Sequence, residues 1–218
     1  MDVFDIWTVP GSPFARAVMA TLEEKGLPWR IRPLAPMDSK GPAHLARNPF
    51  GRMPAVEHGD FSLYETQAVM RYADRLVPTP ALTPAEPRAE ARMNQLMGIG
   101  DWYLFPQVSA AIIFGRVIAP KFGIPADEAR IAAALPQAPV SVNEIARLLG
   151  DQTFMAGETL SLADLLLAPQ LVFLPDCAEG HALLAPHANL RAWIARIEAR
   201  PSMQATTWDA LTELARAA

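Results

Sequence analysis

The first part of the chain alternates between strand-like and helix-like patterns of apolar residues. Residues 3–9 (VFDIWTV) are rich in β-branched and aromatic side chains, and residues 29–33 (WRIRP) alternate apolar with polar positions. Between them, apolar residues recur at helical spacing over residues 13–25, and Gly26 is a typical helix end. These patterns predict a strand, a helix and a second strand.

The next segments predict a hairpin followed by a helix. Residues 54–58 (PAVEH) and 61–64 (FSLY) both have strand character, and the Gly-Asp pair between them is a strong turn signal. A short helix is expected around 42–47, and helical spacing returns over 65–76. A β-α-β unit followed by a hairpin and a helix is typical of a thioredoxin-like α/β domain, which we expect over residues 1–77.

The second part of the chain is separated from the first by a proline-rich segment. Residues 78–87 are interpreted as a linker, because four prolines in VPTPALTPAEP allow neither a helix nor a central strand to continue. Beyond the linker there is no convincing strand, so an all-α domain is expected over residues 88–218. Its helical patterns cover about 88–119, 126–149, 161–173 and 187–199, with a last piece from 202.

Composition and charge exclude several classes of function. The net charge is −4 and the basic residues are scattered, which argues against a nucleic-acid surface. The single cysteine, Cys177, allows no intramolecular disulfide, and the four histidines never fall at the spacing of a zinc site. We therefore expect no metal site and no nucleic-acid partner.

The sequence carries no clear membrane signal. The start MDVFDIW has two acidic residues and no basic region, unlike a signal peptide. The stretch LADLLLAPQLVFLP, read as the most apolar, is interrupted by Asp164 and Pro169 and is too short to span a bilayer. We expect a soluble cytoplasmic protein.

Ser12 stands at the junction of the first predicted strand and helix, directly before Pro13. Serine is favoured as a helix cap and proline as the first helical residue, so Ser12 has a purely structural interpretation. The same geometry suits a bound anion, because a helix N-terminus collects unpaired N–H groups and partial positive charge. A hydroxyl that donates to a bound thiolate would lower the thiol pKa by about one to two units. On these residues alone both interpretations stay open.

The Met53-Pro54 pair lies in the segment NPFGRMPAV, where Pro54 would be the first residue of a strand. A cis bond before Pro54 would turn the N–H and C=O of Met53 outward, where a peptide ligand can pair with them as an added strand. The alternative is that Pro54 only ends the preceding loop.

Glu65 and Thr66 lie where the last predicted strand passes into a helix. An acid and a hydroxyl in the first turn of a helix can be no more than caps. They can also bind an amino-acid head group, with the hydroxyl at its carboxylate and Glu65 at its ammonium. Together with Ser12 and Met53, they outline a site for a short acidic thiol peptide.

Four segments together resemble the cytosolic glutathione transferases, over essentially the whole chain. SPFARAVMATLEEKGL, NPFGRMPAV and SLYETQAVMRYADRL are similar to the glutathione-site segments of that family in order and spacing. GETLSLAD is similar to a structural motif of the family, and in it Ser161 and Asp164 have the spacing of a capping box. The resemblance is to serine-type, bacterial-like members, since no tyrosine ends the first strand and no cysteine stands at position 12. It implies the glutathione transferase fold.

The resemblance also implies roles for individual residues. Ser12 would activate the sulfur of glutathione, and the backbone of Met53 would pair with its cysteinyl part before a cis Pro54. Glu65 and Thr66 would bind its γ-glutamyl end. The residues implied at the glycyl carboxylate are Lys40 and Arg52.

Four aromatic residues are implied in the pocket of the electrophile, with core or dimer contacts as the alternative for each. They are Phe14, Trp102, Tyr103 and Phe105. Glutathione is the co-substrate, so no metal or redox cofactor is implied. The resemblance further implies a homodimer, with helices near 65–76 and 88–119 at the interface.

The leading hypothesis is a detoxifying transferase that conjugates the glutathione thiolate to a hydrophobic electrophile. A glutathione-dependent isomerase or dehalogenase would use the same site on another electrophile. A third hypothesis is a binding or adaptor protein that keeps the fold without turnover. The residues do not identify the acceptor substrate.

Overall fold

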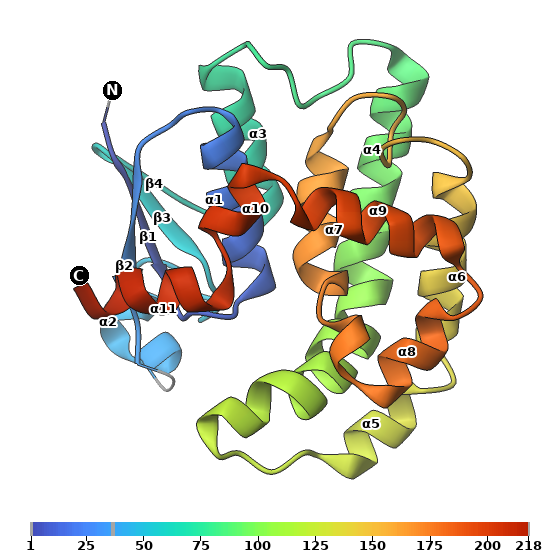
Figure 1. The fold of residues 1–218 in the computed structure, drawn as a ribbon. Coiled ribbons are helices and arrows are strands. Elements are labelled where there is room, and N and C mark those ends of the chain that lie inside the picture. Colours follow the sequence, from blue (N-terminus) through green and yellow to red (C-terminus); the bar gives the residue numbers. More distant parts are fainter. Residues whose placement is uncertain (1, 36–37, 218) are drawn as a thin grey trace. The chain divides into compact units, whose positions relative to one another are not determined.

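The structure is a computed structural model that describes residues 2–35 and 38–217 (Figure 1). The chain divides into two compact units. The first contains Met1–Ala81 together with Ala199–Ala218, and the second contains Leu82–Glu198. The division falls inside the predicted proline-rich linker, where residues 77–86 form neither helix nor strand.

The first unit contains a mixed four-stranded sheet. Its strands are β1 (Phe4–Thr8), β2 (Trp29–Pro33), β3 (Ala55–His58) and β4 (Phe61–Tyr64), in the spatial order β2-β1-β3-β4. Strand β1 is parallel to β2 and antiparallel to β3, and β3 is antiparallel to β4. The predicted thioredoxin-like arrangement of a β-α-β unit and a hairpin is confirmed.

The core of this unit lies between the sheet and two packed helices, α1 (Pro13–Glu24) and α3 (Thr66–Leu76). Along β1 the buried residues Phe4 and Ile6 alternate with more exposed polar and aromatic positions, so one face of the sheet is apolar and the other is polar. Two short helices stand between β2 and β3, namely η1 (Asp38–Lys40) and α2 (Pro42–Leu45).

A buried ion pair joins the end of α1 to α3. The Nζ atom of Lys25 lies 2.8 Å from Oδ1 of Asp74, and it also donates to the carbonyl of Pro80 in the linker. The side chain of Lys25 is fully buried. Since a buried charge is tolerated only with such partners, this contact fixes the start of the linker to the first unit.

The C-terminal segment belongs to the first unit, whereas the sequence analysis placed residues 88–218 in one helical domain. Helix α10 (Pro201–Ala205) packs against α1, and α11 (Trp208–Ala217) contacts β2, the edge strand of the sheet. A helix over an edge strand shields its unpaired backbone groups from other chains. The side-chain hydrogen bonds that hold this segment join residues between 176 and 187 positions apart, which no local pattern predicts.

The second unit is helical apart from a single bridge between Phe154 and Gly157. Its longest element runs from α4 (Pro87–Ile99) through η2 (Gly100–Ile118), which is wound as a π-helix, into η3 (Ala119–Phe122). The other helices are α5 (Glu128–Ala134), α6 (Ala138–Leu149), α7 (Leu162–Leu171), η4 (Leu174–Asp176), α8 (Ala178–Leu184) and α9 (Ala188–Glu198).

Two details of the second unit differ from the predicted helices. The sequence indicated one helix over residues 126–149, but it is broken between α5 and α6. Pro136 lies in the break, and Pro139 lies in the first turn of α6, where the missing N–H is tolerated. The sequence analysis also missed α8, whose seven residues are too few for a clear apolar period.

Helix α7 is buried along its whole length and begins at the predicted capping box. Oδ2 of Asp164 accepts the N–H and the hydroxyl of Ser161, at 2.9 and 2.7 Å. Oδ1 accepts the N–H of Met155 at 2.9 Å and the indole N–H of Trp193 at 2.8 Å. Burial raises the pKa of the Asp164 carboxyl, against four hydrogen bonds that favour its charged form. The capping box therefore ties the start of α7 to the preceding loop and to α9.

One helix, Pro87–Phe122, is long and apolar enough to cross a membrane by length and composition alone. The stretch expected to be the most apolar, residues 162–175, is a different segment, which covers α7 and reaches η4. Half of the apolar window of Pro87–Phe122 is buried within the structure, and the core helix of a soluble protein meets the same criteria.

Candidate functional site

The sheet brings three predicted site segments together at one end of its strands. Strand β1 ends near Trp7, which pairs with Ala55 at the start of the antiparallel strand β3. Ala55 in turn pairs with Tyr64 at the end of β4. Three segments therefore leave the sheet at the same end of its strands. They are the loop before Ser12, the turn before Ala55 and the residues after Tyr64. The predicted convergence of the glutathione-site segments follows from this register.

Ser12 caps helix α1 at this end of the sheet. Its Oγ accepts the backbone N–H of Ala15 at 3.3 Å, and Pro13 occupies the first helical position. The side chain is half-buried and keeps its own hydroxyl proton, because the cap uses the oxygen only as an acceptor. The structural interpretation of Ser12 is thus present in the fold, and it leaves the hydroxyl able to donate to a ligand.

The Met53–Pro54 bond is cis, as the sequence analysis considered. Pro54 is buried at the start of β3, and Met53 is half-buried. Among the residues that the structure describes, no hydrogen bond engages the backbone N–H or C=O of Met53. Both groups are the kind that an extended peptide pairs with when it adds to a sheet edge.

Two buried side chains hold the loop that precedes Met53. The amide of Asn48 and Nε2 of His44 both lie against the carbonyl oxygen of Arg52, at 3.0 and 2.8 Å. A carbonyl only accepts, so Nε2 of His44 carries the proton in this contact. Asn48 Oδ1 also accepts the N–H of Phe50 at 3.1 Å. The sequence analysis missed the contribution of both side chains, although Asn48 stands in the quoted NPFGRMPAV segment.

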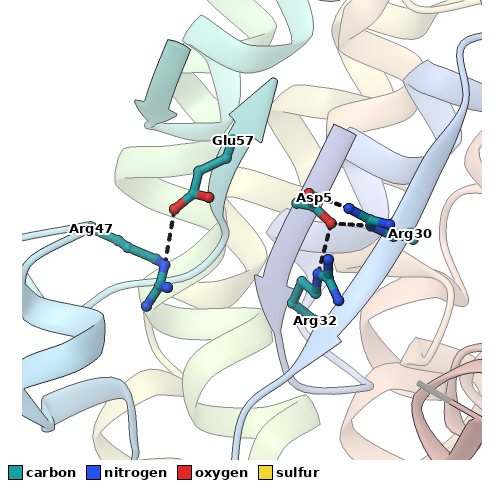
Figure 2. A network of polar contacts seen from close by, with 5 residues as sticks. All are labelled: Asp5, Arg30, Arg32, Arg47 and Glu57. Carbon is teal, nitrogen blue, oxygen red and sulfur yellow. Dashed lines mark hydrogen bonds and ion pairs between the residues drawn. The ribbon is translucent and has the colours of Figure 1, made fainter. Parts of the chain in front are cut away.

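A further contact positions this loop from the polar face of the sheet. The guanidinium of Arg47 lies 4.2 Å from the centre of the Trp7 ring. Its Nε donates to Glu57 at 3.1 Å, as Figure 2 shows. These cation–π and ion-pair contacts join the segment that follows α2 to β1 and β3. They hold the segment between α2 and Pro54 against the sheet.

On the same face, Asp5 lies between two arginines (Figure 2). It bonds to both Nε and Nη2 of Arg30, the latter at 2.9 Å, and to Nε of Arg32 at 2.7 Å. These bonds, that from Arg30 first, hold the pKa of the Asp5 carboxyl below its usual range. The charges here pair across β1 and β2 and belong to the solvated face of the sheet.

Lys40 and Arg52 are exposed on the loops near the same end of the sheet. The Nζ atom of Lys40 donates to the carbonyl of Phe50 at 3.2 Å. It also approaches Gly51, where an added Cβ would lie 2.9 Å from Nζ. The two loops therefore meet through Lys40, whose ammonium contacts the chain at Phe50 and Gly51, directly before Arg52.

Glu65 has an unusual backbone conformation. It precedes the first residue of α3 with φ 71°, and it is the one non-glycine residue with positive φ in the described ranges 2–35 and 38–217. A non-glycine residue held in such a conformation costs about 1–3 kcal/mol, and such strain clusters at functional sites. Glu65 is exposed, while Thr66 beside it is buried.

The four aromatic residues predicted for the electrophile pocket differ in exposure. Phe14, in the first turn of α1, and Phe105, in η2, are half-buried. Trp102 and Tyr103, also in η2, are 79% and 65% exposed. The core alternative is therefore wrong for Trp102 and Tyr103.

Metal-binding chemistry has no obvious centre in the described part of the chain. There, no three side chains of His, Cys, Asp or Glu gather in an arrangement that could hold a metal ion. Cys177 is buried, and burial raises the pKa of its thiol, which disfavours the reactive thiolate.

Both halves of the chain match family models. The model for the glutathione S-transferase N-terminal domain matches residues 7–81, and that for the glutathione S-transferase C-terminal domain matches residues 103–201. A glutathione S-transferase from Hyoscyamus muticus is 30% identical over 195 residues, which cover 88% of this chain and 91% of that protein.

The chain belongs to the glutathione S-transferase family.

Solved structures agree with this assignment. Glutathione S-transferase I from maize in complex with an atrazine–glutathione conjugate is 25% identical, with a TM-score of 0.80 over 96% of this chain and 98% of that one. A glutathione S-transferase I bound with lactoylglutathione has 25% identity and a TM-score of 0.79, over 93% of this chain and 97% of that one. Plant proteins of a phi-class-like type are among the relatives, and one of them, glutathione S-transferase 4 from Zea mays, is 30% identical over 201 residues.

This glutathione S-transferase therefore has the predicted fold and the predicted enzyme class, which conjugates glutathione. Family members of this kind are soluble and typically cytosolic.

Proposed function

We propose that the Ser12 hydroxyl activates glutathione by donating a hydrogen bond to its sulfur. The observation that carries this proposal is the cap geometry. Ser12 Oγ accepts from Ala15 N–H at the positive end of α1, so the cap does not use the hydroxyl proton, which is available to an anion. A hydrogen bond to a thiolate and the helix dipole both favour the ionised sulfur.

The rest of glutathione would bind across the same end of the sheet. The unpaired N–H and C=O of Met53, beside Pro54, fit the cysteinyl backbone as an added strand. The strained Glu65 and its neighbour Thr66 fit the γ-glutamyl head group at the start of α3. The exposed cations proposed for the glycyl carboxylate are Lys40 and Arg52.

The acceptor is proposed to be a hydrophobic electrophile. The maize relative named above is described in complex with a glutathione conjugate of atrazine, a product of such a reaction. The predicted electrophile pocket of Phe14, Trp102, Tyr103 and Phe105 stays a prediction. Homodimer formation and a cytoplasmic location are proposed with it, and the exposed rings of Trp102 and Tyr103 suit a dimer contact.

Two substitutions at Ser12 separate its two roles. Ser12→Ala removes both the cap and the hydroxyl, whereas Ser12→Gly removes the hydroxyl and keeps a residue that caps almost as well. We expect both variants to raise the pKa of bound glutathione by about one to two units, which lowers turnover about ten- to a hundredfold near neutral pH.

Stability should behave differently. Ser12→Ala should lower the free energy of unfolding by about 1 kcal/mol, and Ser12→Gly by only a few tenths, about 0.3 kcal/mol. The thiol pKa is read from the ultraviolet absorbance of the bound thiolate. An unchanged thiol pKa in both variants would leave Ser12 as a cap and nothing more.

A further inference from the structure

Trp208, the first residue of α11, packs directly on the turn that carries Ser12. A Cβ placed on Gly11 would lie only 1.9 Å from Cζ3 of Trp208 and 2.6 Å from its Cε3. The indole ring therefore occupies the volume where any other residue at position 11 would have its side chain. Gly11 also has φ 91°, a conformation that other residues rarely adopt. The ring and the glycine form one close contact.

The backbone hydrogen bond within the turn beneath the ring is long. Ser12 N–H donates to the carbonyl of Val9 at 3.4 Å, which is a long hydrogen bond. Pro10 and Gly11 are half-buried. The three atoms closest to the Cβ position of Gly11 all belong to the Trp208 ring, so the ring packs on this side of the turn.

The C-terminal segment holds the chain on both sides of Ser12. Trp208 packs on the residue before it, and the carbonyl of Met203 accepts from Nη2 of Arg16, four residues after it, at 3.0 Å. Arg16 is buried, and its position lies one helical turn beyond Ser12 in α1. Two contacts from one segment therefore bracket the cap.

The position of Trp208 is itself fixed. Thr206, fully buried between α10 and α11, donates to the carbonyl of Ser202 at 2.8 Å. Thr207 accepts the N–H of Ala210 at 3.3 Å and so caps the start of α11. The link between the two helices is therefore ordered, and the indole has a defined place over Gly11.

We infer that Trp208 is a positioning residue for glutathione activation, because its ring fixes the 9–12 turn and thereby aims the Ser12 hydroxyl at the bound sulfur. Trp208 acts through Ser12 in this inference and contacts neither substrate. The inference rests on the proposed role of Ser12 in activating the sulfur.

Trp208→Ala tests it, with the pKa of bound glutathione as the readout. We expect the thiol pKa to rise by about one unit, which reduces turnover about tenfold at a pH below that pKa. Trp208→Phe keeps an aromatic face over Gly11, so the thiol pKa in this variant should stay close to that of the wild type. Leu214→Ala is the matched control, since Leu214 is an exposed apolar residue on the same helix. A thiol pKa unchanged in Trp208→Ala overturns the inference.

A double variant separates this inference from the proposal on which it rests. If Trp208 acts through Ser12, then Trp208→Ala has no further effect on the thiol pKa in a Ser12→Gly background. An equal effect in both backgrounds overturns the inference and leaves the role of Ser12 intact. If Ser12→Gly alone leaves the thiol pKa unchanged, the proposed role of Ser12 fails first. Circular dichroism spectra establish that each variant is folded. If Trp208→Ala is not folded, Trp208→Leu serves as the test, because leucine keeps apolar volume but removes the flat ring over Gly11, and an unchanged thiol pKa in that variant overturns the inference.

Discussion

Glu24, the last residue of α1, joins that helix to the C-terminal segment through a single carboxylate. It accepts two bonds from Arg200, at 2.7 and 2.8 Å, and one from the hydroxyl of Ser202 at 2.5 Å. Burial alone would raise the pKa of this carboxyl, but the bonds from Arg200 and Ser202 outweigh it, and the pKa lies below its ordinary value of 4.5.

This lowered pKa makes part of the stability of the first unit depend on pH. A carboxylate with a lowered pKa in the folded state stabilises the fold fully above its unfolded value and loses that contribution as pH falls below about 4.5. Glu24→Gln should therefore lower the free energy of unfolding by about 1 kcal/mol at pH 7, after allowance for the partial exposure of the pair. The difference between wild type and variant should shrink towards pH 4.

Chemical denaturation at the two pH values measures this effect. Glu23→Gln is the control, because Glu23 accepts from Trp29 instead of the C-terminal segment. A wild type and a Glu24→Gln variant with the same loss of stability between pH 7 and pH 4 would contradict the prediction.

At the residue scale, the sequence predicted local features and missed contacts that depend on distant residues. Ser12 as a cap follows from the preferences of a single position and is present. Pro54, expected as the first residue of the strand, lies directly before β3, which begins at Ala55. The bonds from His44 and Asn48 to the carbonyl of Arg52 depend on how a loop folds back, so no spacing in the sequence indicates them.

At the element scale, the carboxylate of Asp164 holds the start of α7 in place through four hydrogen bonds. Each oxygen of Asp164 accepts two hydrogen bonds, and all the donors are buried or backbone groups. The arrangement needs two acceptor oxygens at one place. An amide supplies only one, and its NH2 group would face two donors.

Asp164→Asn should therefore lower the free energy of unfolding by about 3 kcal/mol, because it leaves two buried donors without partners. Ser161→Ala keeps the carboxylate and removes one donor, so a loss of about 1 kcal/mol is expected. Urea denaturation monitored by far-ultraviolet circular dichroism measures both values. Equal losses in the two variants would show that the second acceptor oxygen matters little.

The elements themselves were predicted unevenly, for a physical reason. The strands and helices of the first unit were located within a few residues, because proline and glycine mark their ends and their periods differ. In the helical unit the period hardly changes from one helix to the next. There, the break at Pro136 and the short helix α8 were lost in a continuous helical pattern.

At the scale of the whole chain, sequence order is a poor guide to which parts fold together. Residues after Ala199 follow a helical unit but pack with the sheet at the start of the chain. They are held there by two side chains of α1: Arg16 donates to the carbonyl of Met203, and Glu24 accepts from Arg200. Such long-range pairing is set by the packing of the finished unit, and helical periodicity alone assigns the segment to the wrong neighbour.

The proposed homodimer is the last property of the whole molecule, and the exposed rings of η2 give it a test. Trp102 and Tyr103 present 79% and 65% of their surfaces to solvent, and large aromatic residues of this kind are enriched at subunit interfaces. A double variant with Trp102→Ser and Tyr103→Ser should weaken dimer formation at least about tenfold, since a buried aromatic at an interface contributes about 2 kcal/mol or more. Sedimentation equilibrium measures the dissociation constant. Phe122→Ser is the control, because Phe122 is an exposed aromatic beyond the helix expected at the interface. A double variant that dimerises as tightly as the control would place the interface elsewhere and return both rings to the predicted electrophile pocket.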